Sequence, residues 1–128
     1  MPLTTTKKTS AFDFRQSVAY DPERKRHFHI YARRQLQQLA NALALTPGSY
    51  DLRSNPAGIA VSGEVTLHAD ALYVQVSQPA TQADTGILFR SCAGQRDYIG
   101  RRNHFGSLGL LHEPDQLAGL IRRHVTPE

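Results

Sequence analysis

The sequence predicts one α+β domain, in which a long N-terminal helix and a C-terminal helix flank a four-stranded antiparallel sheet in the order α-β-β-β-β-α. Apolar residues recur every three or four positions in two segments, one early in the chain and one at its end, which indicates amphipathic helices. Between these segments apolar and polar residues alternate, which indicates strands buried on one face. Strands that follow one another without intervening helices favour an antiparallel sheet with helices on one face.

The first helix is predicted to follow a polar arm. Residues 1–20 form this flexible arm, whose second half docks on the single domain of residues 21–128. The helix begins at Asp21 and Pro22, because aspartate is a common N-cap and proline suits the first helical position. Turn chemistry at residues 47–48 ends the helix. Its apolar face consists of Phe28, Ala32, Leu36, Leu39 and Leu43.

Three strands are predicted in the middle of the chain. The first is short and covers Tyr50–Arg53, before turn residues at 54–58. The second covers residues 59–68, where Gly63 indicates a bulge or bend. It forms a hairpin with the third, residues 72–76, across a tight turn. The apolar positions of these two strands alternate and are Ile59, Val61, Val65, Leu67, Leu72, Val74 and Val76.

The last strand and the second helix complete the predicted domain. The strand covers residues 86–92, and its apolar start indicates burial on both faces, so we place it centrally in the sheet. The second helix begins at Glu113 and Pro114 and ends near Pro127. Its apolar side consists of Leu117, Leu120, Ile121 and either His124 or Val125.

Composition indicates a soluble protein with an anionic partner. The chain has 128 residues, 40% of them hydrophobic and 20% charged, as is typical of one globular domain. Its net charge is +4, and 12 of the 15 basic residues are arginines, whose planar forks suit phosphates and carboxylates. The same bias also follows from the codons of a GC-rich bacterial genome, whatever the function.

The cysteine and histidine content limits redox chemistry and metal binding. Cys92 is the single cysteine, which excludes an internal disulfide and every multi-cysteine metal site. The six histidines do not form closely spaced ligand pairs, so we expect no metal and no cofactor. The first residues lack the apolar core of a signal peptide, and no apolar run is long enough to span a membrane. A cytoplasmic location is therefore expected.

Residues 93–107 are predicted to be irregular and to form the functional site. This segment combines three glycines and three arginines with the flat rings of Tyr98, His104 and Phe105. Arginines bind phosphates and aromatic rings stack on bases, so we predict a non-enzymatic domain that binds an anionic partner, above all nucleic acid. The predicted binding residues are Arg90, Arg96, Tyr98, Arg101, Arg102 and His104, with Arg26 and Arg33 of the first helix as a second contact surface.

Other interpretations stay open. The basic residues can be ordinary solvated surface, or they can bind an acidic patch on another protein in an interaction adaptor. An enzyme would use Cys92 as nucleophile with Asp97 and His104 nearby, although a lone cysteine in an apolar strand is more often a core residue. A homodimer is also expected, because the first helix has apolar side chains outside its main stripe: Ile30, Tyr31 and Leu45.

Overall fold

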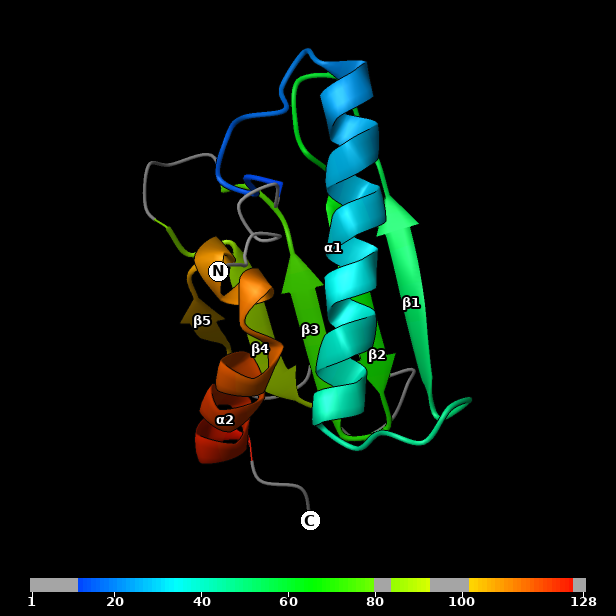
Figure 1. Ribbon diagram of the computed structural model, residues 1–128, viewed down its shortest axis with the longest axis vertical. Helices are drawn as coiled ribbons and strands as arrows, with labels where there is room; N and C mark the ends of the chain where they lie inside the picture. The colour runs from blue at the N-terminus through cyan, green and yellow to red at the C-terminus, as the bar shows by residue number, and fades with distance from the viewer. Residues whose placement is uncertain (1–11, 80–83, 93–101, 126–128) are drawn as a thin grey trace, which may run out of the picture.

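The α+β fold is confirmed, and its antiparallel sheet has one strand more than predicted. The structure, a computed structural model, describes residues 12–79, 84–92 and 102–125. Within these residues five antiparallel strands pair in their sequence order (Figure 1). The elements are α1 (Pro22–Ala42), β1 (Tyr50–Asn55), β2 (Glu64–Ala69), β3 (Leu72–Val76), β4 (Ile87–Ser91), β5 (His104–Gly106), the 3-10 helix η2 (Leu108–His112) and α2 (Pro114–His124).

Helix α1 begins where the sequence predicts. The Asp21 side chain accepts a hydrogen bond from the backbone N–H of Arg24 at 3.1 Å, and Pro22 occupies the first turn. The helix ends at Ala42, one residue before the last predicted apolar position. None of the helices in the described parts of the chain has the length and apolar character that crossing a lipid bilayer requires.

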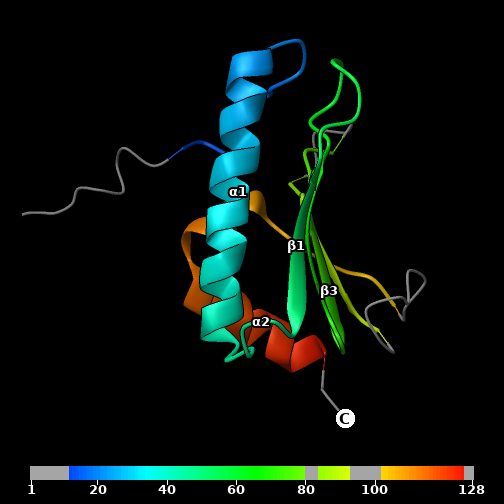
Figure 2. The same ribbon diagram turned by 90° about the vertical axis from the view of Figure 1, so that its right-hand side faces the viewer.

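The helices cover only one face of the sheet. Figure 2 shows the sheet edge-on, with α1 and α2 on the same side of it. The core lies between these layers, where side chains of α1 and α2 meet one face of the strands. The sheet contributes six side chains with no exposed surface to this core: Val65, Leu67, Val74, Val76, Ile87 and Phe89.

The prediction of a strand over residues 59–68 is wrong in its first half. Residues 59–62 belong to the loop between β1 and β2, and β2 begins only at Glu64. Two side chains of α1 hold this loop: Lys25 donates to the Gly58 carbonyl at 2.6 Å, and His29 Nε2 lies 2.7 Å from the Ser62 carbonyl oxygen. These contacts occupy carbonyl groups that a longer strand would pair with a neighbouring strand.

The fifth strand lies inside the segment predicted to be irregular. Strand β5 pairs with β4 through His104 and Phe105, so β4 lies between two strands, as the prediction of a central position requires. At three residues, β5 is too short to produce a recognisable alternation of apolar and polar residues. Sequence periodicity therefore could not separate it from a loop.

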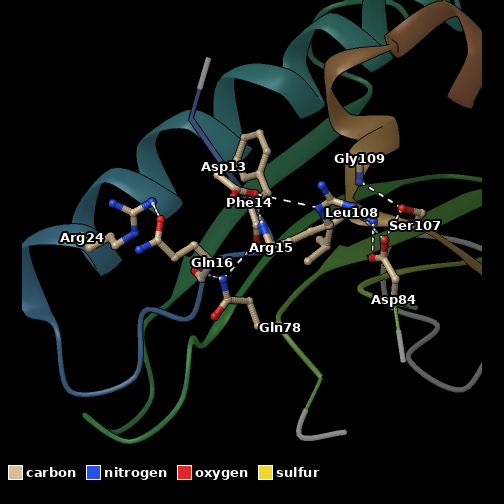
Figure 3. Close-up of polar contacts among 10 residues, drawn as sticks. All are labelled: Asp13, Phe14, Arg15, Gln16, Arg24, Gln78, Asp84, Ser107, Leu108 and Gly109. Atoms are coloured by element: carbon tan, nitrogen blue, oxygen red, sulfur yellow. Dashed lines mark hydrogen bonds and ion pairs between the residues drawn. The ribbon is translucent and has the colours of Figure 1, made fainter. Parts of the chain in front are cut away.

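The Gln78 side chain fastens the segment before α1. The Gln78 amide nitrogen donates to the carbonyls of Phe14 at 2.9 Å and Gln16 at 2.7 Å (Figure 3). The amide oxygen of Gln78 accepts from the Val18 N–H at 3.1 Å. Phe14 and Val18 are fully buried in the core. Residues 1–11 of the predicted arm lie outside the described residues, and the domain boundary at residue 21 stays a prediction.

A second polar contact joins Asp84, three residues before β4, to the start of η2. The Asp84 carboxylate accepts from the Ser107 hydroxyl at 2.5 Å and from the Leu108 N–H at 3.0 Å, and Arg15 lies 3.9 Å away (Figure 3). The Ser107 hydrogen bond lowers the pKa of Asp84 below its ordinary value, with smaller lowering effects from the Leu108 N–H and Arg15. Partial desolvation opposes this lowering.

Candidate binding surface on the open sheet face

The second face of the sheet presents polar and aromatic side chains. The register places Asp51, His68, Tyr73 and Arg90 in one row across β1 to β4. The next row contains Arg53, Thr66, Gln75, Leu88 and Phe105. Successive side chains of a strand point to opposite faces, so both rows lie opposite the apolar side chains that meet the helices. We call this surface the open face, since α1 and α2 both lie on the other side (Figure 2).

Arg90 is the most unusual residue of the open face. Only 7% of it is exposed, and its guanidinium lies over the Tyr73 ring, 4.2 Å from the ring centroid. Among the described residues, no carboxylate forms an ion pair with Arg90, and its buried Nε has no hydrogen-bond partner. Burying a charge without a counter-ion is costly, so the position of Arg90 needs an explanation beyond the contacts of the described residues.

Tyr73 connects Arg90 to the neighbouring histidine. The His68 ring meets the Tyr73 ring edge to face, with the two centroids 5.1 Å apart. The Tyr73 hydroxyl donates to the Gln75 side-chain oxygen at 2.9 Å. These contacts hold the Tyr73 ring in one orientation beneath the Arg90 guanidinium.

A hollow of about 380 Å³ lies on the open face beside these rings. This volume falls within the range of small-molecule sites, about 300–1,000 Å³. The lining combines hydrogen-bond donors and acceptors with two ring walls. It consists of Asp51, Arg53, Ser54, Asn55, Glu64, Thr66, His68 and Tyr73.

A glycine places the Glu64 carboxylate in this hollow. Gly63 has a φ of +71°, and a Cβ atom at this position would lie 2.2 Å from the Asn55 carbonyl oxygen. Only glycine fits such a close approach together with a left-handed backbone. The approach brings the loop back onto β1, so that Glu64 pairs with Asn55 at the start of β2.

The described residues that were predicted to bind an anion do not all lie on one surface. Arg90 lies on the open face, whereas His104 stacks between Phe89, at 5.5 Å, and His124, at 4.9 Å, on the side of the helices. Arg102 is exposed just before β5. Three further residues predicted for the site, Arg96, Tyr98 and Arg101, lie outside the described residues.

The two arginines of the predicted second contact surface lie in the helical layer. Arg26 and Arg33 are both exposed on α1. The Arg26 guanidinium is 3.1 Å from the Glu23 carboxylate, which neutralises part of its charge. Helix α1 and the open face are separated by the sheet itself, so these arginines and Arg90 cannot touch the same few atoms of a ligand.

Sequence reasoning missed most of the open face. Tyr73, His68 and Glu64 occupy the polar positions of the alternating strand pattern, and alternation alone predicts only that such positions face solvent. The strand register could have revealed part of this surface. A tight turn between two strands fixes their register, so His68 and Tyr73 must be neighbours. Phe105 was noted as a flat ring, and it is 54% exposed on this face.

Cys92 is buried at the end of β4. Its Sγ atom lies 3.5 Å from the Ala69 carbonyl oxygen and 3.7 Å from that of Asp70. A carbonyl oxygen cannot take the thiol proton, so these contacts give no support to a nucleophilic cysteine.

Comparison with known proteins adds no family to this description. No protein-family model, no curated protein and no solved structure matches the chain. The buried arginine, the rings and the hollow of the open face are therefore the features on which a functional proposal can be based.

Proposed function

We propose that the open face binds single-stranded nucleic acid. The observation that supports this proposal most strongly is Arg90, a buried guanidinium that lies over the Tyr73 ring without a carboxylate partner among the described residues. A phosphate group would supply the missing negative charge and accept hydrogen bonds from the guanidinium fork.

The aromatic side chains of the same face favour nucleic acid over other anions. Phe105 exposes 54% of its surface on the open face, and no aromatic ring of the described residues packs against it. Exposed rings on a sheet can stack with successive bases of a single strand, and this stacking tolerates any sequence. An acidic protein surface would also satisfy Arg90, but it would not require exposed flat rings.

Double-stranded nucleic acid fits this surface less well. Reading base edges of duplex DNA usually requires a helix or a narrow ribbon that enters the major groove. Helices α1 and α2 lie on the other side of the sheet, so neither can accompany the open face into a groove. A single-stranded nucleic acid that lies across the β-sheet can stack its bases on the exposed ring and place its phosphates near the arginine.

The test measures the affinity of a fluorescent thymidine decamer by anisotropy at several salt concentrations. We expect Arg90→Gln to weaken binding by roughly tenfold, since hydrogen bonds to charged groups contribute about 1.5–3 kcal/mol. Loss of one phosphate contact should also reduce the slope of log K against log salt by about 0.7. Arg123→Gln is the matched control, because Arg123 is exposed on α2 in the helical layer.

A second variant protects the test against misfolding. Phe105 is exposed, so Phe105→Ala should leave the fold intact while it removes a stacking contact of about 1–3 kcal/mol. No binding of the decamer by the wild-type protein at low salt would overturn the proposed function. Equal losses in Arg90→Gln and Arg123→Gln would also overturn it, because they would indicate a non-specific effect of charge.

A further inference from the structure

We infer that the hollow on the open face is a subsite for a single nucleobase, and that it prefers guanine. This inference rests on the proposed function, because the hollow lies next to Tyr73, over which Arg90 is stacked. A strand whose phosphate reaches Arg90 would bring the attached base to the neighbouring rings. The hollow, at about 380 Å³, has room for a base with its sugar.

The walls of the hollow suit a flat, polar ligand. Tyr73 contributes a partly exposed ring to the lining, and His68, only 6% exposed, contributes a ring edge. Thr66 and Asn55 supply small polar groups on the adjacent strands. Bases that are pulled out of a helix are commonly held between rings and hydrogen-bonded along their Watson–Crick edges. The Tyr73 ring and the polar side chains of the lining are groups of these two kinds.

The preference for guanine follows from the two carboxylates in the lining. Carboxylates only accept hydrogen bonds, so they select a base whose edge offers donors. The Watson–Crick edge of guanine presents two adjacent donors, the ring N1–H and the exocyclic amine, which match the two oxygens of one carboxylate. Adenine and cytosine each place an acceptor beside their amine, and this acceptor would face a carboxylate oxygen unfavourably.

Glu64 is the carboxylate that we assign to the base. Asp51 already has an oxygen 3.9 Å from the Arg53 guanidinium. Glu64, by contrast, forms no ion pair among the described residues, although it is half-buried. A half-buried carboxylate without a partner gains most from two new N–H donors.

The experiment titrates the protein with guanosine, adenosine, inosine and cytidine 5′-monophosphates and follows backbone amide shifts by NMR. We expect guanosine monophosphate to bind roughly tenfold more tightly than adenosine monophosphate, the usual effect of one bidentate contact. Inosine lacks the exocyclic amine and should fall between them. The shift changes should lie in β1, β2 and β3, which line the hollow.

A single substitution should reverse the preference. Glu64→Gln replaces an oxygen by an amide nitrogen, and the resulting donor and acceptor pair matches the Watson–Crick edge of adenine. We therefore expect this variant to bind adenosine monophosphate better than guanosine monophosphate. Glu113→Gln is the matched control, since Glu113 is exposed before α2 and makes no side-chain cap; the variant should keep the guanine preference.

The outcomes separate this inference from the proposed function. Equal binding of all four nucleotides, or a guanine preference that survives Glu64→Gln, would overturn the guanine subsite. The thymidine decamer, measured in parallel, reports on the strand-binding function alone. If the decamer binds while the nucleotides show no preference, the open face binds strands without a base-selective hollow.

Discussion

The two faces of one sheet have opposite compositions, although the same five strands form both. On the covered face of β2, Val65 and Leu67 have no exposed surface and pack against the helical layer. On the open face of the same strand, Glu64, Thr66 and His68 present polar atoms. The difference shows that one set of alternating residues in each strand supplies the apolar core, while the other set supplies most of the polar side chains.

The open face contains a buried guanidinium whose desolvation opposes folding. Arg90 is 7% exposed without an ion pair in the described chain, and such an arrangement reduces stability. A surface selected for solubility alone would leave an arginine in water, where it is well solvated. The covered face shows no comparable conflict, since its buried side chains in β2 to β4 are apolar.

The largest expected effect is on the free energy of unfolding, which should fall much more for a substitution on the covered face than for one on the open face. Leu67→Ala should lower the free energy of unfolding by about 2–5 kcal/mol, because it leaves a cavity in a core position with no exposed surface. The neighbouring Thr66→Ala removes a partly exposed side chain from the open face and should cost less than about 1 kcal/mol. Equilibrium urea unfolding of both variants measures the difference. Similar losses in the two variants would show that both faces support the core.

A smaller effect concerns the polar contact that fastens η2 at the edge of the covered face. Asp84→Asn keeps one acceptor for Ser107 or Leu108 and removes the negative charge near Arg15. At neutral pH we expect a loss of less than about 1 kcal/mol, because 37% of the Asp84 side chain is exposed and solvent screens the charge.

The pH dependence of this loss identifies its cause. The pKa of Asp84 is lowered in the folded protein, so the carboxylate stabilises the fold at pH values above the ordinary pKa of 3.8. This stabilisation disappears as the pH falls below 3.8 and through the lower pKa of the folded state. Urea unfolding at about pH 7, 5 and 3 should therefore show a gap between wild type and Asp84→Asn that closes at the acid end. A gap that is constant with pH would mean that the charge plays no part.

The sequence predicts the covered face well, because burial leaves a periodic signal. The face of α1 with Phe28, Ala32 and Leu36 is buried as expected, and the hairpin of β2 and β3 has the predicted phase. The exceptions are local. Ile59 and Val61 continue the alternation but are 58% and 51% exposed, because Lys25 and the left-handed Gly63 hold their segment in a loop.

From the sequence, single residues of the open face can be predicted, but their arrangement across the strands cannot. Arg90 was identified from its position beside an arginine-rich segment, but its position over Tyr73 depends on the pairing of β3 with β4. The length of the loop between these strands does not reveal that register. The hollow has residues from three strands, and Glu64 enters it only through the close approach of Gly63 to Asn55. Contacts between strands of this kind have no signature along one segment of sequence.

The smallest expected effect tests whether binding is confined to the open face. Arg33 is exposed on α1, on the opposite side of the sheet from Arg90. Interactions between exposed charges are screened beyond about 10 Å at 0.1 M salt, so Arg33→Gln should change the affinity for the thymidine decamer by less than about twofold. The same anisotropy titration that measures Arg90→Gln provides the comparison. A loss in Arg33→Gln as large as in Arg90→Gln would move the contact surface to the helical layer, where Arg26 and Arg33 would bind the strand and the open face would need another ligand.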